Sequence, residues 1–143
     1  YKGITQNKKS KSNEEGIIRI IESLKENSNS FIFINLVDFD VYYGHRNDPE
    51  GFAKALTYFD NRLPEILKIL DESDALIITA DHGNDPTSVS TDHSREYIPL
   101  LYYKKGGIGR NLGIRETFSD IGKSAAEFFK IKNELKGISF LEN

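Results

Sequence analysis

Hydrophobic and polar positions along this chain follow two spacings, one typical of helices and one typical of strands. Ser12, followed three residues later by Glu15, forms the capping-box pattern of a helix start. Apolar residues then recur at helical spacing, which predicts a helix over residues 13–26. Residues 31–37 are apolar except for Asn35, which predicts a strand covered on both faces, as in a parallel sheet.

A second helix is predicted after Asp48, which serves as its N-cap and is followed by Pro49 at the first helical position. Pro64 lies inside this helix and is expected to bend it or to remove one hydrogen bond. Residues 75–79 predict the next strand, so that strand, helix and strand form a right-handed βαβ unit. The apolar face of the helix consists of Phe52, Leu56, Phe59, Leu63, Ile66, Leu67 and Leu70.

The remaining chain predicts one more strand at residues 97–103 and one more helix, which Thr117 or Ser119 caps and which runs through Phe129. Residues 132–143 are expected to form a loop or a short tail. Alternation of helices and strands predicts an α/β fold with a mainly parallel sheet.

Composition narrows the range of functions. The chain has 143 residues, a length that suits one domain, and it is 38% hydrophobic and 29% charged. A net charge of -3 and the absence of a basic patch argue against nucleic acid as a partner. No run approaches the roughly 18 apolar residues of a membrane span, and cysteine is absent. We therefore expect a cytoplasmic protein without thiolate metal ligands. The chain begins at Tyr1 and contains no methionine, so we expect a piece of a longer protein.

All three histidines follow the first two predicted strands or their loops. Asp40 and His45 come after the first strand, and Asp81, His82 and His93 come after the second. Since ligands bind beyond the carboxyl ends of the strands in open α/β sheets, these five residues are candidates for one metal site. Carboxylate and imidazole together suit Mn²⁺, Zn²⁺ or Fe²⁺ better than Ca²⁺ or Mg²⁺.

Several neighbouring residues have two interpretations. Asp38 and Asp85 either orient the histidines through hydrogen bonds without binding the metal themselves, or cap turns. Arg46 and Arg95 either take a phosphate group or form surface ion pairs. Gly83 is expected to supply a permissive backbone for a bend that lets Asp81 and His82 face the same ion.

The stretches around these residues resemble phosphopentomutase, a family of the alkaline phosphatase superfamily. The resemblance rests on residues 35–40 (Asn-Leu-Val-Asp-Phe-Asp), 43–46 (Tyr-Gly-His-Arg), 79–87 (Thr-Ala-Asp-His-Gly-Asn-Asp-Pro-Thr) and 91–99 (Thr-Asp-His-Ser-Arg-Glu-Tyr-Ile-Pro). The Ala-Asp-His-Gly core is common to the superfamily, whereas Asp-Phe-Asp with Tyr-Gly-His-Arg is more specific. The resemblance covers nearly the whole chain, but only about the carboxyl-terminal third of the family sequence.

The resemblance implies a three-layer sandwich of the alkaline phosphatase type and an enzyme that interconverts ribose 1-phosphate and ribose 5-phosphate, and the deoxyribose pair. It implies two Mn²⁺ ions, with Asp40, His45 and His93 as ligands of one ion and Asp81 and His82 as ligands of the other. Residues 1–143 then form the carboxyl-terminal part of the metal-binding core, without the cap domain, and the amino-terminal remainder of the enzyme is the expected partner.

The family nucleophile, a threonine, is expected upstream of this chain, so no catalytic residue is assigned within it, and the residues that bind the pentose phosphate stay unassigned. Two alternatives remain open at this point. One is another enzyme of the superfamily, such as cofactor-independent phosphoglycerate mutase, and the other is a metal-binding module without catalysis.

Overall fold

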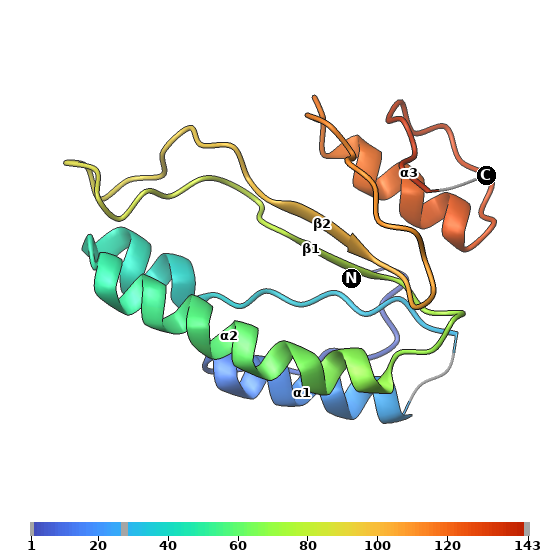
Figure 1. Ribbon diagram of the computed structural model, residues 1–143, viewed down its shortest axis with the longest axis horizontal. Helices are drawn as coiled ribbons and strands as arrows, with labels where there is room; N and C mark the ends of the chain where they lie inside the picture. The colour runs from blue at the N-terminus through green and yellow to red at the C-terminus, as the bar shows by residue number, and fades with distance from the viewer. Residues whose placement is uncertain (1, 27–28, 142–143) are drawn as a thin grey trace. The chain divides into compact units, whose positions relative to one another are not determined.

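The computed structural model describes residues 2–26 and 29–141, which form two compact units, 1–107 and 108–143. Figure 1 shows the helices and strands along the chain. The first unit contains the helices α1 (Asn13–Glu26) and α2 (Pro49–Ile69), the short helical turns η1 (Phe39–Tyr43) and η2 (Gly44–Arg46), and the strands β1 (Leu76–Thr79) and β2 (Leu100–Tyr103). The second unit contains α3 (Ser119–Phe128). No helix among the described residues is long and apolar enough to cross a membrane.

The predicted start signals of α1 and α2 are confirmed. The Ser12 hydroxyl accepts a hydrogen bond from the Glu15 amide at 3.2 Å, and the Glu15 carboxylate accepts the Lys11 amide at 2.8 Å. The Lys11 amide holds the pKa of the Glu15 carboxyl below its usual range, and the Arg19 guanidinium lowers it further. Asp48 caps α2 by accepting the Gly51 amide at 2.9 Å. The chain is helical on both sides of Pro64, which α2 contains in its interior.

The core of the first unit lies where α1 packs against α2 (Figure 1). Ile17 from α1, Ile66 from α2 and Leu70 at the end of α2 are 0%, 2% and 4% exposed. Apolar residues from the helices, from the segment at 31–37 and from β1 pack around them: Ile20, Ile21, Leu24, Leu36, Tyr58, Phe59, Leu67 and Leu76. The predicted apolar faces of both helices therefore meet, except that Ile18 of α1 and Leu56 of α2 remain 40% and 49% exposed.

The prediction of a mainly parallel sheet is wrong for the part of the chain that the structure describes. Its one sheet has two strands, β1 and β2, which pair antiparallel from Leu76 opposite Tyr103 to Thr79 opposite Leu100. Residues 32–36, the centre of the first predicted strand, form no backbone hydrogen bonds with β1. The βαβ unit and the three-layer sandwich are accordingly not formed by these residues, which make up a partial domain.

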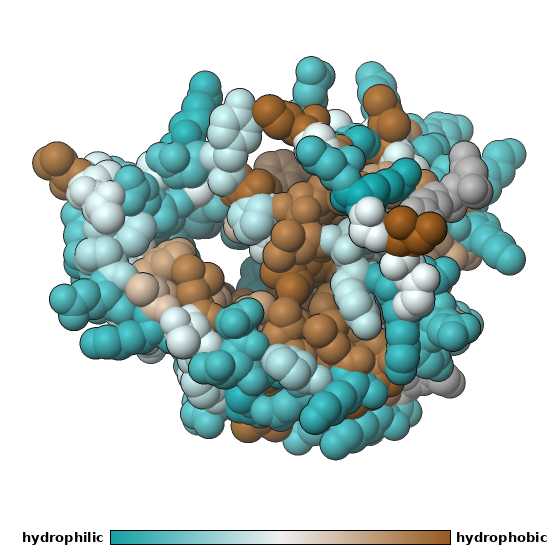
Figure 2. Space-filling model, in the orientation of Figure 1, coloured by the Kyte–Doolittle hydropathy of each residue, from teal (hydrophilic) through white to brown (hydrophobic). Residues whose placement is uncertain are grey.

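The physical reason lies in the neighbours of the segment at 31–37. Its residues alternate between exposed and half-buried, as in a strand with one face covered. Leu36 packs on the core, whereas Phe31 and Phe33 on the other face are 65% and 77% exposed. Figure 2 shows apolar side chains exposed in the band between the β1–β2 pair and α2. An apolar run specifies extended backbone, but pairing requires a neighbouring strand to complete the ladder.

In the second unit, α3 ends one residue before the predicted end. The Thr117 hydroxyl accepts the Ser119 amide at 3.2 Å, so Thr117 makes the side-chain contact at the helix start. The segment predicted as a loop or tail has neither helix nor strand over its described residues, but it is not loose. Phe140 is 3% exposed, and its amide donates to the hydroxyl of the buried Ser124 at 3.0 Å.

Candidate metal centre

Asp40 and His45 lie on η1 and η2, which follow one another without a break. The prediction of loops after a strand is therefore wrong for these residues, because the backbone closes into helical turns. The Gly44 amide donates to the Phe39 carbonyl, and the Asp48 amide donates to the Tyr43 carbonyl. Hydrogen bonds between residues five apart are those of a π-helix, which is frequent at functional sites. This geometry explains why a spacing of five places Asp40 Oδ2 3.3 Å from His45 Nε2.

His82 and His93 are carried by the long connection between β1 and β2. An isolated antiparallel bridge joins Gly83 to Ser94, and the Ser94 amide donates to the Gly83 carbonyl at 3.2 Å. The bridge brings the two ends of the connection together, and the rings of His82 and His93 stack with centroids 3.7 Å apart. His93 thereby reaches Asp40, with 3.4 Å between Nε2 and Oδ1.

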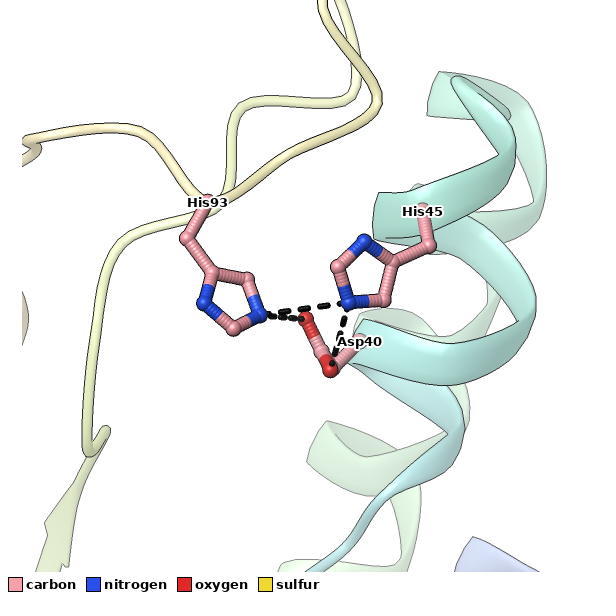
Figure 3. Close-up of side chains that lie close together, drawn as sticks. All are labelled: Asp40, His45 and His93. Carbon is pink, nitrogen blue, oxygen red and sulfur yellow. Dashed lines mark hydrogen bonds and ion pairs between the residues drawn. The ribbon is translucent and has the colours of Figure 1, made fainter.

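Asp40, His45 and His93 converge from two segments on one point (Figure 3). The Nε2 atoms of the two histidines lie 3.2 Å apart, and each lies 3.3–3.4 Å from an oxygen of Asp40. Metal–ligand bonds of about 2.1 Å at angles of about 90–109° place neighbouring ligand atoms roughly 3.0–3.4 Å apart. The three distances are of the size expected between ligand atoms of one divalent ion, and the two histidines approach different oxygens of Asp40. Among residues 2–26 and 29–141, Asp40, His45 and His93 form the group of three histidine, cysteine or acidic residues whose possible ligand atoms all lie within 4.8 Å of one another.

The tautomer of His45 suits this role. Its Nδ1 lies 2.6 Å from the Thr91 carbonyl oxygen. Because a carbonyl oxygen only accepts, Nδ1 carries the proton, and the lone pair of neutral His45 is on Nε2, which faces Asp40 and His93. A backbone carbonyl behind a ligating histidine is a common way to fix its ring. Sequence reasoning identified the segment containing Thr91 but had no signal for its carbonyl.

The other two predicted ligands are arranged differently. His82 stacks on His93, but its Nε2 lies 3.8 Å from the Asp81 carboxylate, whose side chain is 76% exposed. Its Nδ1 lies 3.2 Å from the Gly83 carbonyl. The structure thus brings His82 beside the group of three, and Asp81 and His82 form a separate pair next to it. Their assignment to a second ion stays a prediction, as does the ligand role of all five residues.

Local hydrogen bonds explain Asp38 and Asp85, which the sequence left open as groups that hold the histidines or as caps of turns. The Asp38 carboxylate accepts the Asn13 amide at 2.7 Å, and the Asn13 side chain accepts the Asp38 amide at 3.0 Å, so Asp38 ties the start of α1 to the start of η1. Asp85 accepts the hydroxyl and the amide of Thr87 at 2.7 and 2.8 Å, and these bonds hold its pKa below the usual range. Asp85 is therefore a turn former.

Gly83 has a different role from the predicted one. Its φ is not among the positive values of the described glycines, so no left-handed bend is needed there. A Cβ at this position would instead lie 2.5 Å from the Ser94 carbonyl oxygen and 2.7 Å from the Glu96 amide nitrogen. Glycine is required because two backbone segments approach closely at the bridge.

A family model described as the metalloenzyme superfamily matches residues 1–133. The phosphopentomutase of Dictyoglomus thermophilum is 57% identical over 142 residues, which are 98% of this chain and 36% of that protein. The phosphopentomutases of Dictyoglomus turgidum and Clostridium kluyveri are 54% and 55% identical, over 98% and 97% of this chain. The chain spans 36% of the length of each of these relatives.

Proposed function

We propose that this chain, which belongs to the metalloenzyme superfamily, forms the metal-binding part of a phosphopentomutase, an enzyme that interconverts ribose 1-phosphate and ribose 5-phosphate, and the deoxyribose pair. The observation that supports the proposal most directly is the geometry of Asp40, His45 and His93, whose ligand atoms have the spacing of a coordination shell. The identity of more than half to phosphopentomutases over nearly the whole chain supports the choice of reaction.

In this proposal, Asp40, His45 and His93 hold one divalent ion, for which two nitrogens and one oxygen favour Mn²⁺, Zn²⁺ or Fe²⁺. The Thr91 carbonyl keeps the proton of His45 on Nδ1, so that Nε2 can bind. Asp81 and His82 contribute two ligands to a second ion. When bound, the two ions supply electrostatic stabilisation for the oxygens of a phosphoryl group in transfer.

Phosphoryl transfer through a phosphoenzyme also needs a nucleophile. None of the threonines beside the site, Thr79, Thr87 and Thr91, lies in the sequence pattern of the family nucleophile. Thr79 and Thr87 donate their hydroxyls to the Pro99 carbonyl and to Asp85, respectively. We therefore expect the isolated 143-residue chain to bind a divalent ion weakly but to be inert as a mutase, with the nucleophile supplied by another part of the enzyme.

Two measurements test this proposal. Calorimetric titration of the chain with Mn²⁺ should detect binding that weakens from about pH 7 to about pH 5.5, because protonated imidazoles cannot bind a metal. His45→Ala and His93→Ala should each abolish this site, since both contribute to it, whereas His82→Ala should retain it. Equal losses in all three variants would contradict the assignment of ligands.

The reaction itself is tested by an isomerisation assay on ribose 1-phosphate, with the complete protein that contains this chain. Turnover to ribose 5-phosphate that is lost on metal removal would support the proposal. Activity on phosphoglycerate instead would favour cofactor-independent phosphoglycerate mutase, and metal binding without either activity would favour a binding module. Turnover by the 143-residue chain alone would contradict the expectation that its nucleophile lies elsewhere.

A further inference from the structure

The shortest contact of the Asp40 carboxylate is with an amide side chain that sequence reasoning did not single out. Asn84 Nδ2 donates to Asp40 Oδ1 at 2.7 Å, whereas the nearest histidine nitrogens lie 3.3 and 3.4 Å from the two Asp40 oxygens. We infer that Asn84 is a positioning residue, which occupies Oδ1 of the Asp40 carboxylate, the oxygen beside His93, and leaves Oδ2, the oxygen beside His45, to bind the metal. This inference rests on the proposed function of the site.

The Asn84 side chain occupies a confined place. It comes from the connection after β1, two residues beyond His82, and it crosses to the turn that carries Asp40, 44 residues earlier. The backbone of the buried Gly44 lies directly against it, because a Cβ at Gly44 would come within 2.6 Å of Asn84 Cγ. Absence of a side chain at Gly44 thus creates the space through which the amide reaches Asp40.

The orientation of the amide follows from its partner. An ionised carboxylate only accepts hydrogen bonds, so the NH₂ group of Asn84, rather than its oxygen, faces Asp40. The bond occupies one lone pair of Oδ1 and restrains rotation of the carboxylate. Oδ2, which lies 3.3 Å from His45 Nε2, keeps its lone pairs for the metal. Asp40 is accordingly set to bind through one oxygen, and loss of the amide leaves both oxygens free to bind the ion.

The experiment uses the 143-residue chain with Mn²⁺ and Co²⁺ as probes. Asn84→Leu keeps the branched shape against Gly44 but removes the donor, and Asn84→Ala removes the donor with a smaller side chain. Ser94→Ala is the matched control, because Ser94 fixes the same connection by accepting the Asp85 amide at 2.7 Å without a contact to Asp40. Circular dichroism of each variant shows whether the helices are retained.

We expect both Asn84 variants to bind Mn²⁺ about 10–100-fold more weakly than the wild type, the usual cost of losing a group that orients a ligand. Ser94→Ala should stay within about threefold, because it removes one neutral hydrogen bond and leaves the Asp40 carboxylate held as before. At saturating Co²⁺, the visible absorption per bound ion should fall in the Asn84 variants, because a second Asp40 oxygen raises the coordination number. A merely structural role for Asn84 would leave that absorption unchanged.

The outcomes separate this inference from the proposed function. If the wild type binds Co²⁺ and Asn84→Leu matches it in both affinity and spectrum, the inference is wrong and the metal site stands. If Asn84→Leu and Ser94→Ala lose affinity equally with unchanged spectra, Asn84 acts only by holding the connection, which also overturns the inference. If the wild type binds neither ion, the metal site itself is wrong, and the role of Asn84 is wrong with it.

Discussion

Replacement of Gly83 by alanine tests the close approach that joins the two ends of the β1–β2 connection. The new methyl group would lie 2.5 Å from the Ser94 carbonyl oxygen, 2.7 Å from the Glu96 amide nitrogen and 2.8 Å from Glu96 Cβ. Ordinary van der Waals separation is about 3.5–4.0 Å. Two of the three obstacles are backbone atoms, so the clash cannot be relieved by rotation of a side chain, and the bridge must open.

The structure sets the expected magnitude. Overpacking of a close contact costs about 1–3 kcal/mol, and loss of the bond from the Ser94 amide to the Gly83 carbonyl, 3.2 Å long, adds about 0.5–1.5 kcal/mol. If the connection opens locally, the loss appears in metal binding, because His93 no longer lies beside His45. A combined cost of about 1.5–4.5 kcal/mol then lowers Mn²⁺ affinity roughly 10- to 2,000-fold.

The assay is Mn²⁺ titration of Gly83→Ala beside urea unfolding of the metal-free chain. Gly109→Ala is the control, because a Cβ at Gly109 would meet no atom within 4 Å and its φ is not positive. We expect Gly109→Ala to match the wild type in both measurements. Wild-type affinity and stability in Gly83→Ala, or equal losses in the two variants, would refute the argument from backbone approach.

Three further predictions concern stability. Ile17→Ala should lower the free energy of unfolding by about 2–5 kcal/mol in urea, because Ile17 is fully buried, while Ile18→Ala, at a position 40% exposed, should cost about 1 kcal/mol or less. Asp48→Ala should lower the free energy of unfolding by about 1 kcal/mol through loss of the α2 N-cap. A variant with the same circular dichroism and the same unfolding free energy as the wild type would contradict this prediction. Hydrogen bonds from Thr87 lower the pKa of Asp85, so Asp85→Asn should be less stable than the wild type at neutral pH. The difference in unfolding free energy should shrink as pH falls below about 4, where the wild-type carboxylate becomes protonated. Urea unfolding across this pH range would contradict the prediction if the difference grew.

The sequence determined those features that depend on neighbours along the chain. Helix α1 begins at Asn13 because Ser12 and Glu15 satisfy amides within one turn, and α2 begins where Asp48 and Pro49 place it. Such contacts require no distant residue, so their pattern is visible in the sequence. The same holds for the clustering of aspartate and histidine in two segments, which by itself indicates a metal site.

Pairing of strands could not be determined in this way. The apolar run at 31–37 specified an extended segment with one face on the core, but a ladder depends on a second backbone, and the sequence does not say which one lies alongside. The same limit applies to η1 and η2. Asp40 lies on the π-helical turn η1 and His45 on the 3₁₀ turn η2, whereas the sequence pattern was equally compatible with a loop.

Only the tertiary structure decided which candidate ligands meet and what holds them. His93 reaches Asp40 because the Gly83–Ser94 bridge folds the connection back on itself, and Asn84 reaches the same carboxylate across the space left at Gly44. The contacts of Asp40 with Asn84 and His93 join residues 44 and 53 positions apart, and their energy depends on distances of a few tenths of an ångström. The sequence determined which chemical groups are present, but the folded backbone decided which of them lie within reach of one ion.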